Sequence, residues 1–291
     1  MMKHYFNTNK VLSVTALAIG AITIFFACKK DDKAGADEKR DNQTIAAAQK
    51  ETEINAVYED AFGVVLDANS FHTGLNGQVR KAPEAPNTAR CRGSVEFYPV
   101  DNTTFPKTVV IDFGTGCTDP VGPTRKGKIK IVVSKLFFTT GATATVTFEN
   151  YFVNDIKVEG TQTLTNLSGT SGFGYSYTVA AGKLTYPDGK VYEYGGTRNL
   201  IQKEGSTTPF DIDDDVYELT GNATLKDSSV TATVTINNAL VRKLSCAYIG
   251  KGILTVTANG HAAKVDYGNG ECDNKAILTV GDKTKEITLP R

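Results

Sequence analysis

Lys128-Ile129-Lys130-Ile131-Val132-Val133 is the stretch in which the architecture is clearest, because polar and apolar side chains alternate along most of it. Successive side chains of an extended chain point to opposite faces, so Ile129, Ile131 and Val133 share one face. The same alternation recurs at 145–149, 254–256 and 278–280. It is typical of half-buried antiparallel strands, and we expect roughly 14–16 of them. We therefore predict an all-β domain over residues 91–291, either an antiparallel hairpin-rich sandwich or an elongated β stack.

Turn motifs separate these strands, and one motif repeats. Pro187-Asp188-Gly189 and Ala258-Asn259-Gly260 are typical of hairpin turns. An acidic residue, an aromatic residue and a glycine follow one another at Asp112-Phe113-Gly114, Glu193-Tyr194-Gly195 and Asp266-Tyr267-Gly268. We interpret each triplet as the end of a strand–turn–strand unit that packs beside similar hairpins. Carboxylates at equivalent repeat positions favour a structural role, such as pairing with a neighbouring strand's lysine or capping a turn, over the paired carboxylates of a glycosidase.

Four cysteines fall into two pairs with equal spacing. Cys91 and Cys117 are 26 positions apart, as are Cys246 and Cys272. If each pair flanks its own hairpin, the midpoints are residues 104 and 259, which both lie in turn-like sequence. Opposed Cα atoms of a hairpin are about 4.5–5.5 Å apart, which a disulfide can span. We predict the disulfides Cys91–Cys117 and Cys246–Cys272. The alternatives are free buried thiols or a four-cysteine metal site, and the usual CxxC spacing of such a site is absent.

The segment before the β domain has a helical period. Apolar residues three and four positions apart form one stripe over residues 44–67, at Ile54, Val57, Tyr58, Ala61, Phe62 and Val65. We predict an amphipathic helix here that packs on the β domain, with a partner-binding helix as the alternative. Residues 28–43 are polar and highly charged, which predicts a flexible tether. Residues 68–90 contain several glycines and prolines, which predicts a linker.

The N-terminus has the organisation of an export signal. Lys3 and Lys10 precede an uncharged run from Val11 to Ala27, which is shorter than the roughly 20 apolar residues of a spanning helix. Cys28 follows at once, and this order resembles the signal of bacterial lipoproteins. The resemblance implies that residues 1–27 are a cleaved signal peptide and that Cys28 is the lipidation site, where several acyl chains anchor the protein durably. The alternatives are a plain signal peptide or an uncleaved anchor with an incidental cysteine.

The residues after Cys28 bear on location. Lys29-Lys30-Asp31-Asp32 is similar to the surface-export signal of lipoproteins from the Bacteroidota. Asp112-Phe113-Gly114-Thr115-Gly116-Cys117 and Asp266-Tyr267-Gly268, with the segment from Cys272 to Ala276, resemble a group of envelope lipoproteins from the same phylum. The resemblance covers most of residues 91–291 and implies family membership and an outer-membrane, surface-exposed location. A periplasm-facing location is the alternative. The resemblance implies no catalytic residue and no cofactor.

Other chemistry-bearing residues fit structural roles better than functional ones. The densest acidic cluster is a weak calcium candidate without EF-hand spacing, and we expect a solvated loop there, at Asp211, Asp213, Asp214 and Asp215. His72 and His261 share no spacing with cysteines or carboxylates. The basic run from Arg125 to Lys128, with Lys130, predicts a solvated strand face, and contact with lipid head groups or an acidic glycan is the alternative. Five tyrosines are locally dense and favour core packing over a glycan-binding platform, at Tyr175, Tyr177, Tyr186, Tyr192 and Tyr194.

Composition limits the function classes. The chain of 291 residues has 32 basic and 32 acidic residues, so it is not a generally basic nucleic-acid binder. Removing residues 1–27 leaves 264 residues with 30 basic and 32 acidic, a charge of −2. We predict a lipid-anchored, non-enzymatic envelope protein with a binding or structural role, whose partners are the membrane, through the anchor, and a protein or a glycan. The alternatives are a surface glycan-binding or glycan-processing lipoprotein and a calcium-stabilised adhesin.

Overall fold

The computed structural model describes residues 32–71, 91, 93–101, 103–118, 123–137, 139–169, 173–207 and 214–289. They form one helix and one antiparallel sheet of 14 strands. The elements are α1 (Asp32–Phe71), β1 (Ser94–Tyr98), β2 (Lys107–Asp112), β3 (Cys117–Thr118), β4 (Thr124–Val133), β5 (Thr143–Val153), β6 (Ile156–Asn166), β7 (Gly174–Thr185), β8 (Val191–Glu204), β9 (Val216–Lys226), β10 (Thr231–Lys243), β11 (Lys251–Ala258), β12 (His261–Asn269), β13 (Lys275–Val280) and β14 (Lys283–Thr288).

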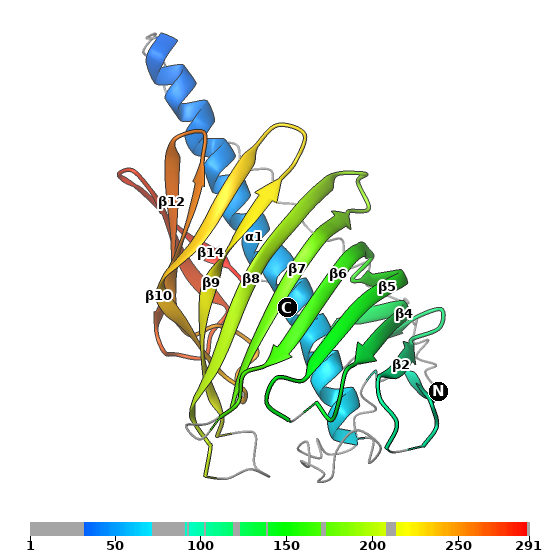
Figure 1. Cartoon of the computed structure of the whole chain (residues 1–291). Coiled ribbons are helices and arrows are strands. Elements are labelled where there is room, and N and C mark those ends of the chain that lie inside the picture. The colour runs from blue at the N-terminus through cyan, green and yellow to red at the C-terminus, as the bar shows by residue number, and fades with distance from the viewer. Residues whose placement is uncertain are drawn as a thin grey trace, which may run out of the picture.

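The strands follow one another across the sheet in chain order, apart from the short β3, which pairs with β4 beside β2. The sheet is a long meander with β1 at one edge and β14 at the other, and Figure 1 shows it curling around one side of α1. The all-β prediction is confirmed. Within the described residues all strands belong to one open sheet, which corresponds to the predicted stack of hairpins.

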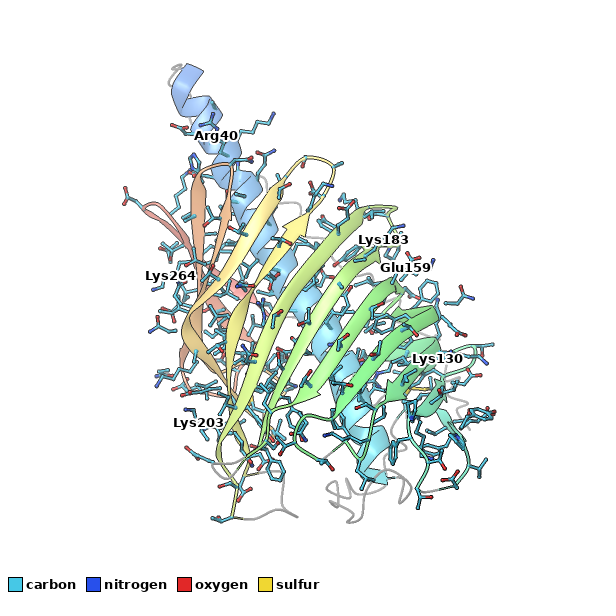
Figure 2. All side chains as sticks on the ribbon, viewed as in Figure 1. Arg40, Lys130, Glu159, Lys183, Lys203 and Lys264 are labelled. Atoms are coloured by element: carbon cyan, nitrogen blue, oxygen red, sulfur yellow. A yellow bond between two sulfur atoms is a disulfide. The ribbon has the colours of Figure 1, made fainter. Side chains whose placement is uncertain are left out.

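The predicted alternation sets the two faces of the sheet. Ile129, Ile131 and Val133 are buried, whereas Lys128 and Lys130 are exposed. We call the face that contacts α1 the inner face and the solvent-facing side the outer face. The outer face carries charged side chains from many strands, among them Lys183 and Glu159 (Figure 2). The hydrophobic core therefore lies between one face of the sheet and the helix.

The curvature has a local cause in the strands. Every pair from β4–β5 through β11–β12 contains a register shift. The outer pairs β1–β2, β2–β4, β12–β13 and β13–β14 are regular. Such bulges bend and twist a sheet. The middle of the sheet is therefore the part that bends around the helix.

A close approach between the helix and the sheet depends on glycine. The Tyr58 hydroxyl donates to the carbonyl oxygen of Glu159 at 3.2 Å. A Cβ atom on Gly182 would lie 2.5 Å from that hydroxyl oxygen, and one on Gly160, which has a φ of +113°, would lie 2.7 Å from the Gly182 Cα atom. A side chain on Gly182 would push the helix away from the sheet, and one on Gly160 would push β6 and β7 apart.

The predicted apolar stripe of the helix is confirmed, because all six of its residues are buried, namely Ile54, Val57, Tyr58, Ala61, Phe62 and Val65. The predicted helix boundary is wrong on the N-terminal side. The composition of residues 28–43 predicts a flexible tether, but α1 begins at Asp32. Seven of the twelve residues 32–43 are Ala, Lys, Glu, Arg or Gln, which are strong helix formers, and Arg40 pairs with Asp37 one turn earlier. The helix also runs to Phe71, four residues into the predicted linker.

The C-terminal part of the predicted linker, residues 72–90, lies outside the described residues, as do residues 1–31 with the predicted signal peptide and Cys28. Among the helical residues that are described, none forms a stretch long and apolar enough to cross a lipid bilayer.

Candidate functional site

The repeated carboxylates do not share a site. Asp112, Glu193 and Asp266 lie on β2, β8 and β12, which are far apart in the sheet order. Asp112 pairs with Lys128 directly opposite on β4, at 2.9 Å, and Glu193 pairs with Lys226 directly opposite on β9, at 3.0 Å. The interpretation as lysine partners is therefore confirmed for these two.

The turn-capping part of the prediction also holds for two of the three carboxylates. The Gly114 amide donates to Asp112 at 2.8 Å, and the Gly268 amide donates to Asp266 at 3.1 Å. The Lys128 ammonium and the Gly114 amide lower the pKa of Asp112. Glu193 departs from the predicted unit, because its triplet lies at the beginning of β8 and not at the end of a strand.

Both predicted cysteine pairings are present. The Cα atoms are 5.4 Å apart in Cys91–Cys117 and 5.7 Å apart in Cys246–Cys272. The first disulfide closes the base of the β1–β2 hairpin and the second closes the base of the β11–β12 hairpin, whose turn contains Asn259 and Gly260 as expected. Because the meander reverses direction at each turn, the two hairpin bases lie at opposite ends of the strands.

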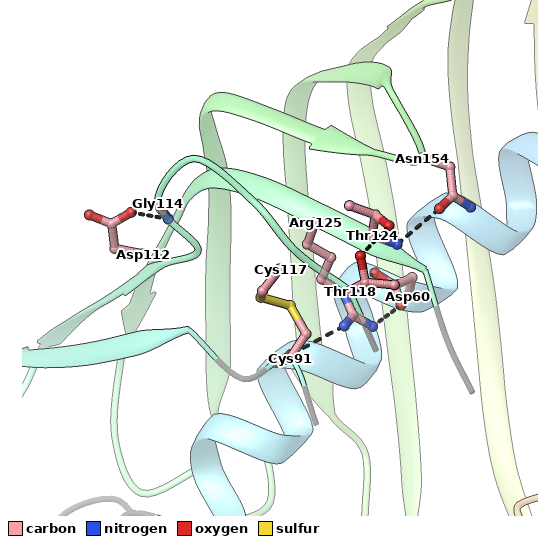
Figure 3. Close-up of a disulfide and its surroundings, with 9 residues drawn as sticks. All are labelled: Asp60, Cys91, Asp112, Gly114, Cys117, Thr118, Thr124, Arg125 and Asn154. Atoms are coloured by element: carbon pink, nitrogen blue, oxygen red, sulfur yellow. Dashed lines mark hydrogen bonds and ion pairs between the residues drawn. A yellow bond between two sulfur atoms is a disulfide. The ribbon is translucent and has the colours of Figure 1, made fainter. Parts of the chain in front are cut away.

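The surroundings of Cys91–Cys117 correct one prediction (Figure 3). The basic run predicts a solvated face for Arg125, but its side chain is only 10% exposed and points to α1. Its guanidinium donates to both carboxylate oxygens of Asp60, at 2.8 and 2.5 Å, and to the Cys91 carbonyl oxygen at 3.3 Å. A bidentate pair of this kind fixes orientation as well as distance. Arg125 therefore joins the helix, the sheet and the first disulfide.

The acidic cluster is described only in part, since Asp211 and Asp213 lie outside the described residues. Asp214 is exposed, but Asp215 is fully buried and accepts a hydrogen bond from Gln202 at 2.5 Å. The expectation of a solvated loop is therefore wrong for Asp215. The described part of the chain holds no group of three or more metal-binding side chains, and calcium binding stays a prediction.

The remaining predicted positions divide between core and surface. Tyr175, Tyr177 and Tyr194 are buried, which confirms core packing for them. Tyr186 and Tyr192 are half-buried, with ring centroids 5.3 Å apart and the Lys50 ammonium 3.9 Å above the Tyr186 ring. His261 contacts Asp41 of α1 at 2.7 Å, a helix contact that its turn position did not indicate. His72 lies outside the described residues.

The chemically most distinctive region is the contact between α1 and the inner face. Glu51 of α1 and Arg198 of β8 form an ion pair at 2.6 Å, with the Glu51 side chain 0% and the Arg198 side chain 3% exposed. The Tyr194 hydroxyl donates to the same Glu51 oxygen at 3.4 Å. Asn55, one turn further along α1, accepts from the Tyr177 hydroxyl and from Arg198. The pair thus lies inside a buried polar network in an otherwise apolar core.

Burial controls the ionisation of this network. Desolvation raises the pKa of Glu51 to about 7, although Arg198 and Tyr194 act in the opposite direction. Desolvation also raises the pKa values of Tyr177, Tyr194 and Tyr267, so these phenols stay neutral. Arg198 stays charged, because a guanidinium does not lose its proton in proteins. Glu51 is therefore the one member of the pair that changes charge near neutral pH.

The ion pairs between α1 and the inner face all distribute their charges in the same way. Among the described residues, each has its acid on the helix and its base on the sheet. Besides Glu51–Arg198 and Asp60–Arg125, Glu59 pairs with Arg242 at 2.5 Å, and Asp41 meets both His261 and Lys283. The inner face is therefore a basic and aromatic surface, and α1 is the acidic helix that fits it.

Sequence reasoning missed this interface, although a signal was present. Arg125 shares the odd-numbered phase of the buried residues Ile129, Ile131 and Val133 on β4. Arg198 shares the even-numbered phase of the buried residues Tyr194 and Leu200 on β8. A charged residue in the buried phase of a strand predicts a buried partner of opposite charge.

Comparison with family models, with curated proteins and with solved structures finds no match for this chain.

Proposed function

We propose that this chain is a lipid-anchored, non-enzymatic protein of the bacterial cell envelope with a binding or structural role. The observation that carries the proposal is the uncharged run Val11–Ala27 ending at Cys28, with basic residues before it and charged residues after it. The two disulfides add support, because structural disulfides persist in oxidising compartments outside the cytosol.

The position of α1 adds a structural consequence. The helix begins at Asp32, four residues after Cys28, and these four residues span at most about 14 Å when extended. The first turn of α1 precedes its contacts with the sheet, which begin at Asp37 with its ion pair to His261 and continue at Asp41 and Thr44 (Figure 1). An anchor at Cys28 would therefore be followed within about 14 Å by a helix that is continuous with the core, so the start of α1 would lie close to the membrane surface.

Metabolic labelling tests the anchor. Cells that express the full chain are grown with an alkyne-bearing fatty acid, and we expect the purified protein to carry the label and to sediment with membranes. The matched control is Cys28→Ser, which should remain unlabelled and leave the membrane fraction. A wild-type chain without label, or equal labelling of the variant, would contradict the proposal.

Surface exposure is a separate proposal based on Lys29-Lys30-Asp31-Asp32. Protease treatment of intact cells should degrade the wild-type domain. Replacing these four residues by alanine should protect it, while acylation at Cys28 stays unchanged. Equal protection of both proteins would place the domain on the periplasmic side of the outer membrane.

A glycan-binding role is the second candidate, and the half-buried pair Tyr186–Tyr192 is the observation that favours it. Exposed aromatic faces bind sugar rings, although Lys50 covers part of this one. Binding of the full chain to a panel of immobilised polysaccharides tests the idea. A hit that is lost in Tyr192→Ala and kept in Tyr248→Ala, a control tyrosine on another loop, would support it. If the chain binds none of the polysaccharides, the glycan-binding proposal is wrong.

A further inference from the structure

The buried ion pair between α1 and the inner face leaves one atom of each side chain unused. Glu51 Oε1 accepts from Arg198 Nη2 at 2.6 Å and from the Tyr194 hydroxyl at 3.4 Å. Among the described residues, Glu51 Oε2 and Arg198 Nη1 are buried without a hydrogen-bond partner in the protein. We call these two atoms the orphan atoms. An acceptor and a donor are therefore enclosed together, each on an ionisable side chain.

Burial makes the two orphan atoms costly. The side chain of Glu51 is 0% exposed and that of Arg198 is 3% exposed, so bulk solvent does not reach either atom. A buried polar group without a partner loses its hydration and gains nothing in return, and the loss is larger for a charged group. In folded proteins nearly all such groups are met by another protein group or by ordered water. A stable contact between α1 and the sheet therefore requires a partner for both atoms.

A second pair in the same interface shows that the protein does not supply that partner here. The Arg125 guanidinium places two nitrogens on the two carboxylate oxygens of Asp60, at 2.8 and 2.5 Å, and so uses both ends of the pair. Arg198 instead turns its Nε toward Asn55 Oδ1 at 3.5 Å, which is longer than the usual N–H···O distance of about 2.7–3.2 Å. The polar network therefore closes loosely around Glu51 and Arg198, at the place where the orphan atoms lie.

The two orphan atoms differ in kind, and the difference identifies the ligand. Each lies two covalent bonds from the paired atom of its own side chain, so the two are close neighbours. The Glu51 oxygen needs a donor, whereas Arg198 Nη1 needs an acceptor. A water molecule offers both and makes about three hydrogen bonds in a protein interior. A small anion such as chloride would accept from Arg198 but has no proton to donate to Glu51, and the guanidinium would repel a metal cation.

We propose that an ordered water molecule is bound between α1 and the inner face, where it donates to Glu51 Oε2 and accepts from Arg198 Nη1. This water adds a bridge beside the direct hydrogen bond, so that the two side chains are joined through both of their polar ends. It is a structural component of the contact between helix and sheet and is cut off from bulk solvent. The site goes beyond the lipid anchor and the envelope location, and it depends on neither of them.

A crystal structure of the full-length protein tests this site, with bromide replacing chloride in the crystallisation solution. We expect an ordered water molecule within about 3.2 Å of both Glu51 Oε2 and Arg198 Nη1, and no anomalous bromide signal beside them. A hydrogen bond from a protein group to either orphan atom, in place of the water, would overturn the proposal. A bromide peak on Arg198 Nη1 would also overturn it, because the site would then bind an anion.

Oxygen-17 relaxation dispersion tests the site in solution, since it counts the water molecules that stay bound inside a protein. Glu51→Met/Arg198→Met removes both orphan atoms and should lose at least one long-lived water molecule per chain. The matched control is Glu193→Met/Lys226→Met in the exposed pair of the outer face, which should keep the wild-type number. Equal numbers in the wild type and the folded inner-face variant would contradict the bound water. If that variant does not fold, the crystal structure of the wild type decides. Neither result depends on acylation of Cys28, so this proposal and the proposed function fail independently.

Discussion

Two ion pairs on the same strand show how differently one kind of interaction works on the two sides of this sheet. Glu193 and Arg198 lie five residues apart on β8, and each pairs with an oppositely charged residue. Glu193 faces solvent with Lys226, and both side chains are more than half exposed. Arg198 faces α1 with Glu51, and neither side chain reaches water. Water screens the first pair, whereas the second pair has lost its hydration and depends on its partners.

The largest effect is expected when Glu51 is removed. Above pH 7, where Glu51 is ionised, Glu51→Leu leaves the Arg198 guanidinium buried without a counter-ion, and this group cannot become neutral. We expect the free energy of unfolding to fall by about 3–5 kcal/mol. Urea denaturation followed by circular dichroism measures this.

The reciprocal variant sharpens the comparison. Arg198→Leu should cost less than Glu51→Leu, because the remaining carboxyl group can take up a proton. The double variant Glu51→Leu/Arg198→Leu should be more stable than Glu51→Leu alone, since it leaves no buried charge. Losses below about 1 kcal/mol in both single variants would mean that the pair behaves like a surface pair.

Removing a disulfide should cause the next largest loss of stability. Removing either Cys91–Cys117 or Cys246–Cys272 opens a loop of the same length, so the entropic loss should be the same, about 3 kcal/mol. Only the first disulfide holds the Cys91 carbonyl against Arg125, which pairs with Asp60. Cys91→Ala/Cys117→Ala should therefore cost more than Cys246→Ala/Cys272→Ala in the same urea assay. If Cys246→Ala/Cys272→Ala costs more, the Cys91–Cys117 disulfide does not support the Arg125–Asp60 pair.

A change in pH should have a smaller effect on the free energy of unfolding, and the pKa of Glu51 determines its sign. The pKa of Glu51 is about 7 in the folded state, against about 4.5 when it is exposed, so between these values the folded protein binds more protons than the unfolded chain. Stability from this group is complete below pH 4.5 and is lost as the pH rises to about 7. The slope is at most about 1.4 kcal/mol per pH unit.

A difference measurement isolates this effect. The stability of the wild type minus that of Glu51→Gln, which cannot titrate, should fall from pH 4.5 to 7 and level off above. The groups around Glu51 are Arg198, Tyr194, Tyr177, Tyr267 and Glu59, and the arginine and the phenols keep their charge states in this range. A flat difference would place the ionisation of Glu51 outside this window.

The smallest effect is expected on the outer face. Lys226→Ala removes the partner of Glu193 and should change the free energy of unfolding by less than about 1 kcal/mol. The change should shrink further in about 1 M salt, because the Debye length there is about 3 Å. A loss as large as that of Glu51→Leu would remove the distinction between the two faces.

Most of the sheet was predictable from sequence, and most of the interface with the helix was not. The alternation at Ile129, Ile131 and Val133, the turn at Asn259-Gly260 and the spacing of the cysteines are local patterns, and each is present in the structure. The direction in which the sheet curls depends on register shifts spread over many strands, which no short pattern reveals. Glu51 and Asp60 were unremarkable charges on a helix until a curled sheet placed Arg198 and Arg125 beside them.

The predicted tether failed for a related reason. Residues 32–43 carry the charge density of a solvated segment, but seven of the twelve are good helix formers (Ala, Glu, Lys, Arg or Gln), and the helix from 44 onward provides a nucleus for them. Further contacts come from residues far along the chain. Asp41 meets His261 across 220 residues of sequence, a distance that local reasoning does not cover.

That same separation determines the order in which the molecule can be completed. α1 leaves the ribosome before any strand, whereas its partners Arg198, Arg242 and His261 emerge in the last third of the chain. Each hairpin of the meander needs only its neighbours and can form as it appears. Tyr58 and Phe62 stay uncovered until β5, β7 and β8 have been synthesised, and Asp41 must wait for β12, so the nascent protein carries a helix with an exposed apolar stripe for much of its synthesis.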